Sequence, residues 1–224
     1  SEFRLMSAQA AEATRAMIAD LSEDPAVAPI WPGLPVHTSA DDAVPRVRAP
    51  RVWNSGFTGR DVKIAVMDTG LDADHPDFRD RLHSYQDFVD PDNTDPQDPN
   101  GHGTHVAGIA AGSGAASDGQ FRGVAPDAQL MIARVLDGMG TGRTSDVMAG
   151  IEWAVEHGAQ VINVSLGGPP YPSDGTDALS VLCDAAVEAG AVVCVAAGHL
   201  GPASHTGGAP GASKRAITIG AVEV

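Results

Sequence analysis

Short apolar runs rich in β-branched residues alternate with helical patterns along this chain, and this alternation limits its fold more than any other feature. Five runs are typical of buried strands, and three segments between them carry apolar residues at helical spacing. Strands that alternate with helices indicate a parallel sheet with right-handed crossovers. We therefore predict an α/β fold, a doubly wound parallel sheet with helices on both faces. The predicted strands are 62–67, 130–133, 161–164, 192–195 and 217–219, and the predicted helices are 102–112, 144–157 and 176–189.

Length and charge exclude several classes of protein. The 224 residues are enough for one large domain or two small ones with a real core. Hydrophobic residues make up 43% of the chain, which excludes a disordered protein. The net charge is −15, so nucleic acid is not an expected partner, because phosphate binding needs clustered Lys and Arg. No apolar run approaches the roughly 18–20 residues that span a membrane, so we expect no membrane span.

The first fifty residues differ from the rest in composition and in predicted secondary structure. Residues 1–6 look like a cloning scar. Residues 7–24 are rich in Ala, and their apolar residues recur at helical spacing, which predicts a short amphipathic helix. We expect the six prolines between residues 25 and 50 to keep that stretch from forming a regular element.

Two polar residues stand where an open parallel sheet places its active site, at the carboxyl ends of its strands. Asp68 follows the first predicted strand, and His102, flanked by Gly101 and Gly103, opens the first predicted helix. A carboxylate that holds one imidazole nitrogen lets the other take a proton from a nucleophile. Such a site needs close backbone approach, which would explain the two glycines. Alone, the Asp would be a helix cap and the His an ordinary packing residue; together they indicate acid–base chemistry.

Three motifs in this sequence resemble those of the subtilisin-like serine peptidases, the subtilases. They are Asp68-Thr69-Gly70, the run GHGTHVAG from Gly101 to Gly108, and the run NVSLGG from Asn163 to Gly168. The second motif is highly specific, and the resemblance extends from about Trp53 to the last residue. It implies a subtilisin-like α/β fold and a serine endopeptidase that hydrolyses peptide bonds with an Asp-His-Ser triad.

The resemblance implies a role for each matching residue. Asp68 would be the triad acid and His102 the general base, whereas His105 would be a packing residue one turn further along. Two edge segments would pair with an extended polypeptide substrate, and a third segment would form the other wall of the main specificity pocket. The edges are Gly140, Thr141 and Gly142 and then Ser165, Leu166 and Gly167; the other wall is Ala196, Ala197 and Gly198.

The resemblance also implies a domain plan and a location. Residues 7–35 would be the remnant of an inhibitory propeptide, and residues 36–52 a linker in which processing occurs. Residues 53–224 would be the N-terminal portion of the catalytic domain. The resemblance implies a secreted, extracellular protein, although no signal peptide opens this sequence.

The family's nucleophile lies in a Gly-Thr-Ser-Met-Ala motif that this sequence, which ends at Val224, does not contain. No serine substitutes for it: Ser165 belongs to the substrate-binding motif, Ser145 starts a helix, and Ser204 and Ser213 lack the strand–turn–helix elbow that presents a nucleophile. We therefore expect a peptidase that is truncated before its nucleophile. It would be inactive without the missing C-terminal segment or a partner chain. The alternative is a non-catalytic pseudoprotease or peptide-binding module.

His199 is a second departure from the family pattern. The family has Asn at this position, where the side chain donates a hydrogen bond in the oxyanion hole. A His can also donate, but its ring has another reach and shape. The departure favours the non-catalytic alternative and predicts that His199 is a poor oxyanion donor.

Calcium is the cofactor that the sequence suggests, as a structural ion. Asp77 matches a family calcium ligand, although the usual partner loop, here residues 113–122, differs in length and composition. A second cluster of hard oxygen ligands lies between Asp87 and Asp98, where a solvated acidic turn is an equally good interpretation. Catalytic zinc at His102 and His105 is disfavoured, because their spacing is i+3 with no intervening Glu. The candidate calcium ligands are Asp77, Asp90, Asp92 and Asp95.

The two cysteines lie on neighbouring predicted elements, Cys183 on a helix and Cys194 on the strand that follows it. By length along the helix and the strand they could meet across the helix–sheet interface. Two free thiols are the preferred interpretation, because cysteine packs well as a small hydrophobic residue.

Overall fold

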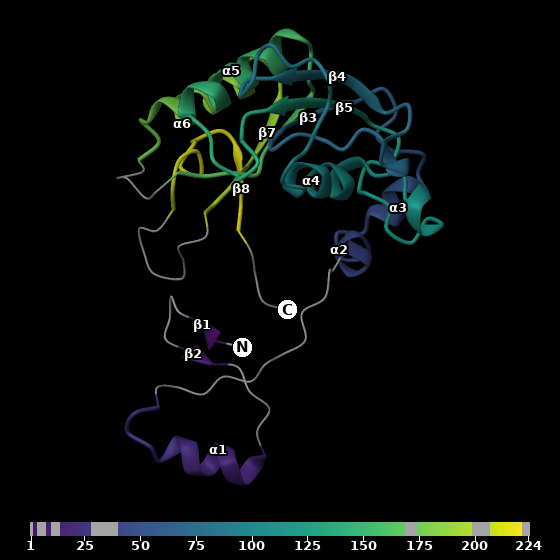
Figure 1. Cartoon of the computed structure of the whole chain (residues 1–224). Helices are drawn as coiled ribbons and strands as arrows, with labels where there is room; N and C mark the ends of the chain where they lie inside the picture. The colour runs from purple at the N-terminus through teal and green to yellow at the C-terminus, as the bar shows by residue number, and fades with distance from the viewer. Residues whose placement is uncertain are drawn as a thin grey trace. The chain divides into compact units, whose positions relative to one another are not determined.

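The computed structural model describes residues 2–3, 8–9, 14–27, 40–168, 174–198 and 207–220 (Figure 1). By contacts the chain divides into two units, Ser1–Thr38 and Ser39–Val224. Each unit is described by itself.

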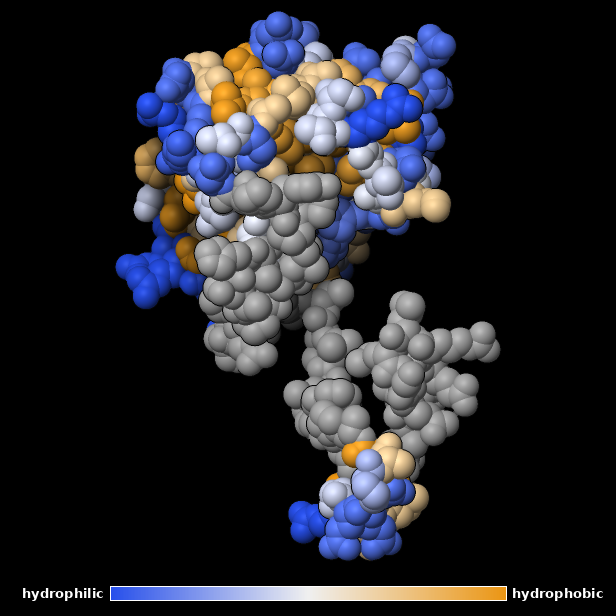
Figure 2. Space-filling view, turned by 90° about the vertical axis from the view of Figure 1, so that its left-hand side faces the viewer, coloured by the Kyte–Doolittle hydropathy of each residue, from blue (hydrophilic) through white to orange (hydrophobic). Residues whose placement is uncertain are grey.

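The first unit contains two short strands and one helix. Strands β1 (Glu2–Phe3) and β2 (Ala8–Gln9) pair antiparallel, and helix α1 spans Arg15–Ser22. The predicted helix over 7–24 is therefore confirmed only from residue 15 to residue 22, and residues 8–9 are a strand. Helix α1 has no buried residue, and its surface mixes hydrophobic and hydrophilic side chains (Figure 2).

The second unit is built on a six-stranded sheet in which every neighbouring pair of strands is parallel. Its strand order is β4-β5-β3-β6-β7-β8. The chain therefore starts near the middle of the sheet, runs to one edge and returns, and then builds the other half. The strands are β3 (Lys63–Asp68), β4 (Leu82–Asp87), β5 (Gln129–Arg134), β6 (Val161–Val164), β7 (Val192–Ala196) and β8 (Ile217–Ile219).

Helices cover both faces of this sheet, as the strand–helix alternation predicts. Helices α5 (Thr144–Glu156) and α6 (Ala178–Glu188) lie on one face, and α4 (His102–Ala111) lies on the other (Figure 1). Alternate residues of each strand point to opposite faces, so side chains of the sheet pack into two hydrophobic cores, one on each face. Met67 of β3 packs in the core beneath α5 and α6, and its neighbour Val66 packs in the core beneath α4. The predicted fold class and all five predicted strands are confirmed.

One strand and two short helices of this unit are not in the sequence prediction. Strand β4 is an edge strand whose residues are mostly polar, so it carries no apolar run that would reveal it. Helix α2 (Ala40–Arg46) and the first two residues of helix α3 (Ala49–Trp53) fall inside the stretch that we expected the prolines to keep irregular, and that expectation is wrong there. Pro50 stands in the first turn of α3, where its missing N–H costs nothing. Left-handed Arg48 (φ 61°) separates the two short helices.

Trp53, the last residue of α3, attaches the helix to the rest of the unit. Its Nε1 donates a hydrogen bond to the carbonyl of Val124 at 2.8 Å, and the guanidinium of Arg122 lies over its ring at 5.1 Å. Short 3₁₀ turns at Pro76–Phe78 and Ala115–Ser117 complete the regular structure of the described residues.

A buried ion pair joins the carboxyl ends of the edge strand β4 and its neighbour β5. Arg134 at the end of β5 donates to Oδ2 of Asp87 at the end of β4, at 2.7 Å, and both side chains are buried. Burial opposes ionisation of Asp87, but hydrogen bonds from Asn93, the Asp90 backbone and Arg134 hold the pKa of its carboxyl below 3.8. Burial, and after it the nearby Asp87, raises the pKa of Tyr85 to about 12.

The two cysteines are free, as preferred from the sequence, and they lie on opposite faces of the sheet. Cys183 of α6 is buried in the same core as Val193 and Val195 of β7. Cys194 stands between those two valines, so its side chain points the other way. The two thiols therefore cannot meet across the helix–sheet interface.

Candidate active site

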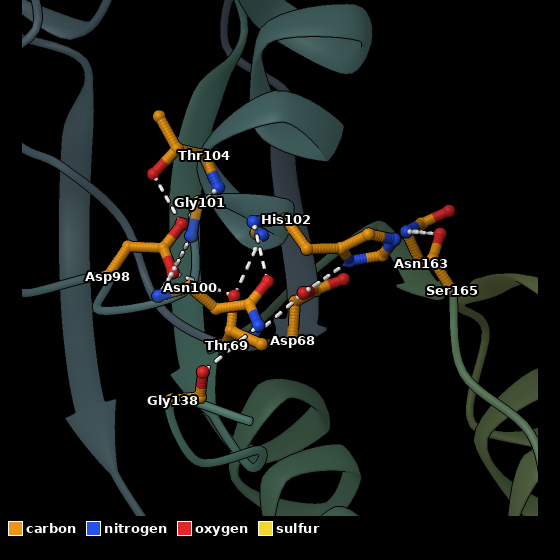
Figure 3. Close-up of polar contacts among 11 residues, drawn as sticks. Asp68, Thr69, Asp98, Asn100, Gly101, His102, Thr104, Gly138, Asn163 and Ser165 are labelled. Atoms are coloured by element: carbon orange, nitrogen blue, oxygen red, sulfur yellow. Dashed lines mark hydrogen bonds and ion pairs between the residues drawn. The ribbon is translucent and has the colours of Figure 1, made fainter. Parts of the chain in front are cut away.

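Asp68 and His102 come together at the carboxyl edge of the sheet (Figure 3). Asp68 ends β3 and is completely buried, and His102 is the first residue of α4. The Nδ1 atom of His102 lies 2.7 Å from Oδ1 of Asp68, and the backbone N–H of Thr69 donates to the same oxygen at 2.7 Å. Because a carboxylate accepts hydrogen bonds, Nδ1 carries the hydrogen in the neutral ring and Nε2 is left free to accept a proton.

Gly103 lets the start of α4 press against the end of β3. A Cβ atom at this position would overlap the carbonyl oxygen of Gly70 and lie 3.2 Å from Cβ of Asp68. The close approach expected from the sequence therefore exists at Gly103. It does not exist at Gly101, where a Cβ would meet nothing within 4 Å. Gly101 is needed for its backbone instead, because its φ of +94° is a left-handed conformation that favours glycine.

His102 opens onto a groove of about 790 Å³. Both predicted substrate-binding edges line it, and Thr69, Asn100 and Leu136 lie on its surface as well. The six edge residues are Gly140, Thr141, Gly142, Ser165, Leu166 and Gly167. The predicted second wall, Ala196, Ala197 and Gly198, is not part of the described lining. The Ala197 N–H instead bonds Ile219 at the end of β8, and the role of this wall stays a prediction.

Hydrogen bonds hold both edges in place. Asp137 accepts from the backbone N–H groups of Met139 (2.8 Å) and Thr141 (3.0 Å), and these bonds, the one from Thr141 first, lower the pKa of its carboxyl. Asn100 donates to the carbonyl of Gly138 at 3.1 Å and so connects this edge to the residues just before His102. On the other edge, Asn163 donates to Oγ of Ser165 at 2.7 Å.

No hydroxyl of the described residues is hydrogen-bonded to Nε2 of His102. The serines weighed as substitutes have other partners: Ser145 donates to Asp146 at 3.1 Å, and Ser213 donates to Asp184 at 2.5 Å. Ser204 and the candidate oxyanion residue His199 lie outside the described residues.

The described carboxylates are not gathered into a metal-binding cluster. No group of three His, Cys, Asp or Glu residues that could hold a metal ion exists within the described residues. Asp87 is occupied by Arg134, and Oδ1 of Asp77 accepts from the backbone N–H of Ala116 at 2.8 Å. These contacts do not test the two separate candidate positions, Asp77 and the cluster that includes Asp90, Asp92 and Asp95. Calcium binding stays a prediction, which melting curves in Ca²⁺ and in EDTA would test.

His105 is not the packing residue that the resemblance implies. Its side chain is exposed and lines a separate cavity of about 270 Å³, together with His75, Phe78 and Phe121. Sequence reasoning also missed Asp98, which it counted only as one acid of the acidic loop. Its position four residues before His102 is the signal that could have singled it out.

Comparison with known proteins places these features in one family. A profile of the subtilase family matches residues 59–224. Serine protease AprX of Bacillus subtilis (strain 168) is 38% identical over 235 residues, which cover 100% of this chain and 53% of that protein. Subtilisin E of the same organism is 38% identical over 227 residues (99% and 57%), and the minor extracellular protease Vpr is 41% identical over 199 residues (84% and 24%). The chain thus spans about half the length of the first two relatives.

Proposed function

This chain belongs to the subtilase family, and we propose that it supplies the acid and the base of a serine endopeptidase active site. The observation that carries the proposal is the 2.7 Å contact between Asp68 and His102 at the border of an open groove. A buried carboxylate, an imidazole facing the groove and two edges for a peptide backbone are the parts that such a site needs.

In the proposed reaction His102 first accepts a proton from the nucleophile and then donates it to the leaving group. A serine hydroxyl gives its proton to Nε2 of His102 as its oxygen attacks the peptide carbonyl, which forms a tetrahedral intermediate. The imidazolium then gives that proton to the departing amine, and an acyl-enzyme remains that water hydrolyses by the same route. Asp68 keeps its negative charge throughout, holds the ring through Nδ1 and stabilises the imidazolium.

The substrate that fits the groove is an extended polypeptide. Within the described residues, the backbone groups of Gly142, Leu166 and Gly167 have no recorded hydrogen-bond partner. Free backbone donors and acceptors on two edges can pair with a peptide that runs between them as an added strand. The groove is lined mostly by small and apolar residues, so binding would depend on the peptide backbone more than on charge.

The nucleophilic serine of this reaction is not among the described residues. Ser165 lies on the predicted substrate edge and accepts from Asn163, and no described hydroxyl, that of Ser165 included, bonds to Nε2 of His102. The reaction therefore needs a serine from another segment or a partner chain. We also propose secretion, and the relative Vpr, a minor extracellular protease, supports it. Within the described residues, no helix combines the length and hydrophobicity that crossing a bilayer would need.

Turnover of an unstructured peptide tests the proposal. The purified chain is assayed alone and after mixing with a separately made segment of a relative that carries the Gly-Thr-Ser-Met-Ala motif. We expect hydrolysis only in the mixture and its loss with His102→Ala. Peptide binding without turnover in any mixture would favour the non-catalytic module. Turnover by the chain alone, abolished by His102→Ala, would show that the serine is within this sequence.

A further inference from the structure

Asp98 accepts more hydrogen bonds than any role in a solvated acidic turn requires. It receives five, from the Thr69 hydroxyl (2.8 Å), the backbone N–H groups of Asn100 (3.2 Å), Gly101 (2.8 Å) and Thr104 (2.8 Å), and the Thr104 hydroxyl (2.6 Å). Burial opposes its ionisation, but these bonds, the one from the Thr104 side chain first, hold the pKa of its carboxyl below 3.8. Asp98 is thus a fixed anion.

The donors to Asp98 come from both elements that carry the Asp68–His102 pair. Gly101 and Thr104 flank His102 at the start of α4, whereas Thr69 directly follows Asp68 at the end of β3 (Figure 3). A residue that only capped the helix would bond to N–H groups of the helix alone. Asp98 instead joins the helix start to the strand end.

Thr69 extends this connection to the pair itself. Its buried hydroxyl donates to Asp98 and accepts from the backbone N–H of Gly103 at 2.9 Å. Its own backbone N–H donates to the Oδ1 atom of Asp68 that also contacts His102. Hydrogen bonds therefore connect Asp98 through Thr69 to the backbone of Gly103, next to His102, and to the carboxylate of Asp68.

We propose that Asp98 is a positioning residue, whose carboxylate sets the register of α4 against β3 and thereby the contact between His102 and Asp68. Asp98 does not line the groove, so it acts on the pair and not on bound peptide. A role of Asp98 in catalysis rests on the proposed function. The contact between His102 and Asp68, however, can be measured without any turnover.

The hydrogen on Nδ1 of His102 is the probe. In a short hydrogen bond to a carboxylate this proton resonates far downfield in NMR spectra, and it broadens or shifts when the bond lengthens. Three variants of the full chain, and the conservative variant Thr69→Ser, are prepared with ¹⁵N-labelled histidine and compared with the parent. Asp98→Asn replaces one carboxylate oxygen by an amide NH₂, which cannot accept hydrogen bonds from the surrounding donors. Thr69→Val removes the hydroxyl connection but keeps the carboxylate and its bonds to the α4 backbone. Asp184→Asn is the matched control.

Asp184 is a suitable control because it is also a loop-fixing carboxylate. It accepts from the Ser213 hydroxyl at 2.5 Å and from the backbone N–H of Arg215 at 2.8 Å, and it is not part of the groove. We expect the downfield proton to shift or broaden in Asp98→Asn and in Thr69→Val, and to stay unchanged in Asp184→Asn. Thr69→Ser, which keeps the hydroxyl, should restore the parent signal.

An unchanged His102 signal in folded Asp98→Asn and in Thr69→Val would overturn the proposal, because Asp98 would then only stabilise the fold. If Asp98→Asn does not fold, Thr69→Val decides by itself. In a preparation that hydrolyses peptides, we further expect Asp98→Asn to lower kcat on the order of 10-fold to 100-fold with little change in KM. Absence of turnover in every preparation would contradict the proposed function but leave the NMR result intact.

Discussion

The carboxylate of Asp68 is wholly buried, whereas the His102 side chain that contacts it at 2.7 Å is 50% exposed. The imidazole therefore separates the groove from the negative charge that holds it. A proton taken up at Nε2 comes from the solvent side, and the charge that stabilises it is on the dry side, where water screens it least. The pair is arranged so that a proton can be gained and released at Nε2, on the groove side of the ring, while Asp68 keeps its charge on the other side.

Gly103→Ala should destabilise the fold and separate the pair. The added Cβ would overlap backbone that belongs to Gly70, and backbone cannot rotate away as a side chain can. We expect a loss of about 1–3 kcal/mol in the free energy of unfolding, measured by urea denaturation.

Gly108→Ala in the same helix is the matched control. Its Cβ would reach only Phe78, at 3.9 Å, so the change should stabilise α4 by roughly 0.5–1 kcal/mol. Equal effects of the two substitutions would contradict the packing that we describe at the start of the helix.

Arg134→Met should cost far more stability than the loss of a surface ion pair. Removing the guanidinium leaves the buried Asp87 carboxylate without its cation, and such a break costs about 3–5 kcal/mol. Arg215→Ala breaks the exposed pair with Glu188, at 3.0 Å, and should cost about 0–1 kcal/mol. Comparable denaturation midpoints for the two variants would show that Asp87 is not buried as described.

Acid should destabilise the protein below about pH 4. The carboxyls of Asp87, Asp98 and Asp184 have folded-state pKa values below 3.8, so the folded form binds their protons less readily than the unfolded form. Their contribution is fully present above the unfolded pKa and is lost as the pH falls through the folded pKa. Urea midpoints between pH 6 and pH 3 should fall with acid, and less steeply in Asp184→Asn. Midpoints that rise on acidification would contradict this sign.

A thiol reagent should modify Cys194 before Cys183 in the native chain. Cys183 is fully buried, and burial raises the pKa of its thiol to about 12, so little thiolate forms. Burial also raises the pKa of Cys194, but this thiol is only half buried. Mass spectrometry of partly alkylated protein should find the label on Cys194, and both sites should react equally in urea. A disulfide between the two residues in folded protein would contradict their placement on opposite faces.

Sequence reasoning succeeded where one physical signal dominated. The buried strands are apolar runs rich in β-branched residues, and the helices carry apolar residues on one side. Both patterns can be recognised in the sequence. Strand β4 was invisible because only one of its residues, Asp87, is buried. Helix α2 was missed because Pro45 was treated as a breaker, although it lies in the second-to-last position of a seven-residue helix.

The candidate site shows the same limit. The motifs placed Asp68 and His102 at one edge of the sheet, and their contact follows from that placement. The part played by Asp98 depends on which donors surround it in space, including Thr69, 29 residues earlier in the chain. No local pattern encodes such a set of partners, and an acidic, proline-rich loop is typical of solvated surface.

The walls of the groove and the support of the pair come largely from different parts of the chain. Segments 140–144 and 165–168 shape the groove, whereas Asp98 and Gly103 hold the pair without touching the groove. In the proposed reaction, peptide preference could therefore be changed by substitutions at Arg143 and Leu166 that leave the Asp68–His102 pair as it is. A fold with this division can change the peptides that it recognises by changing its loops, because the residues that hold the acid–base pair are not part of those loops.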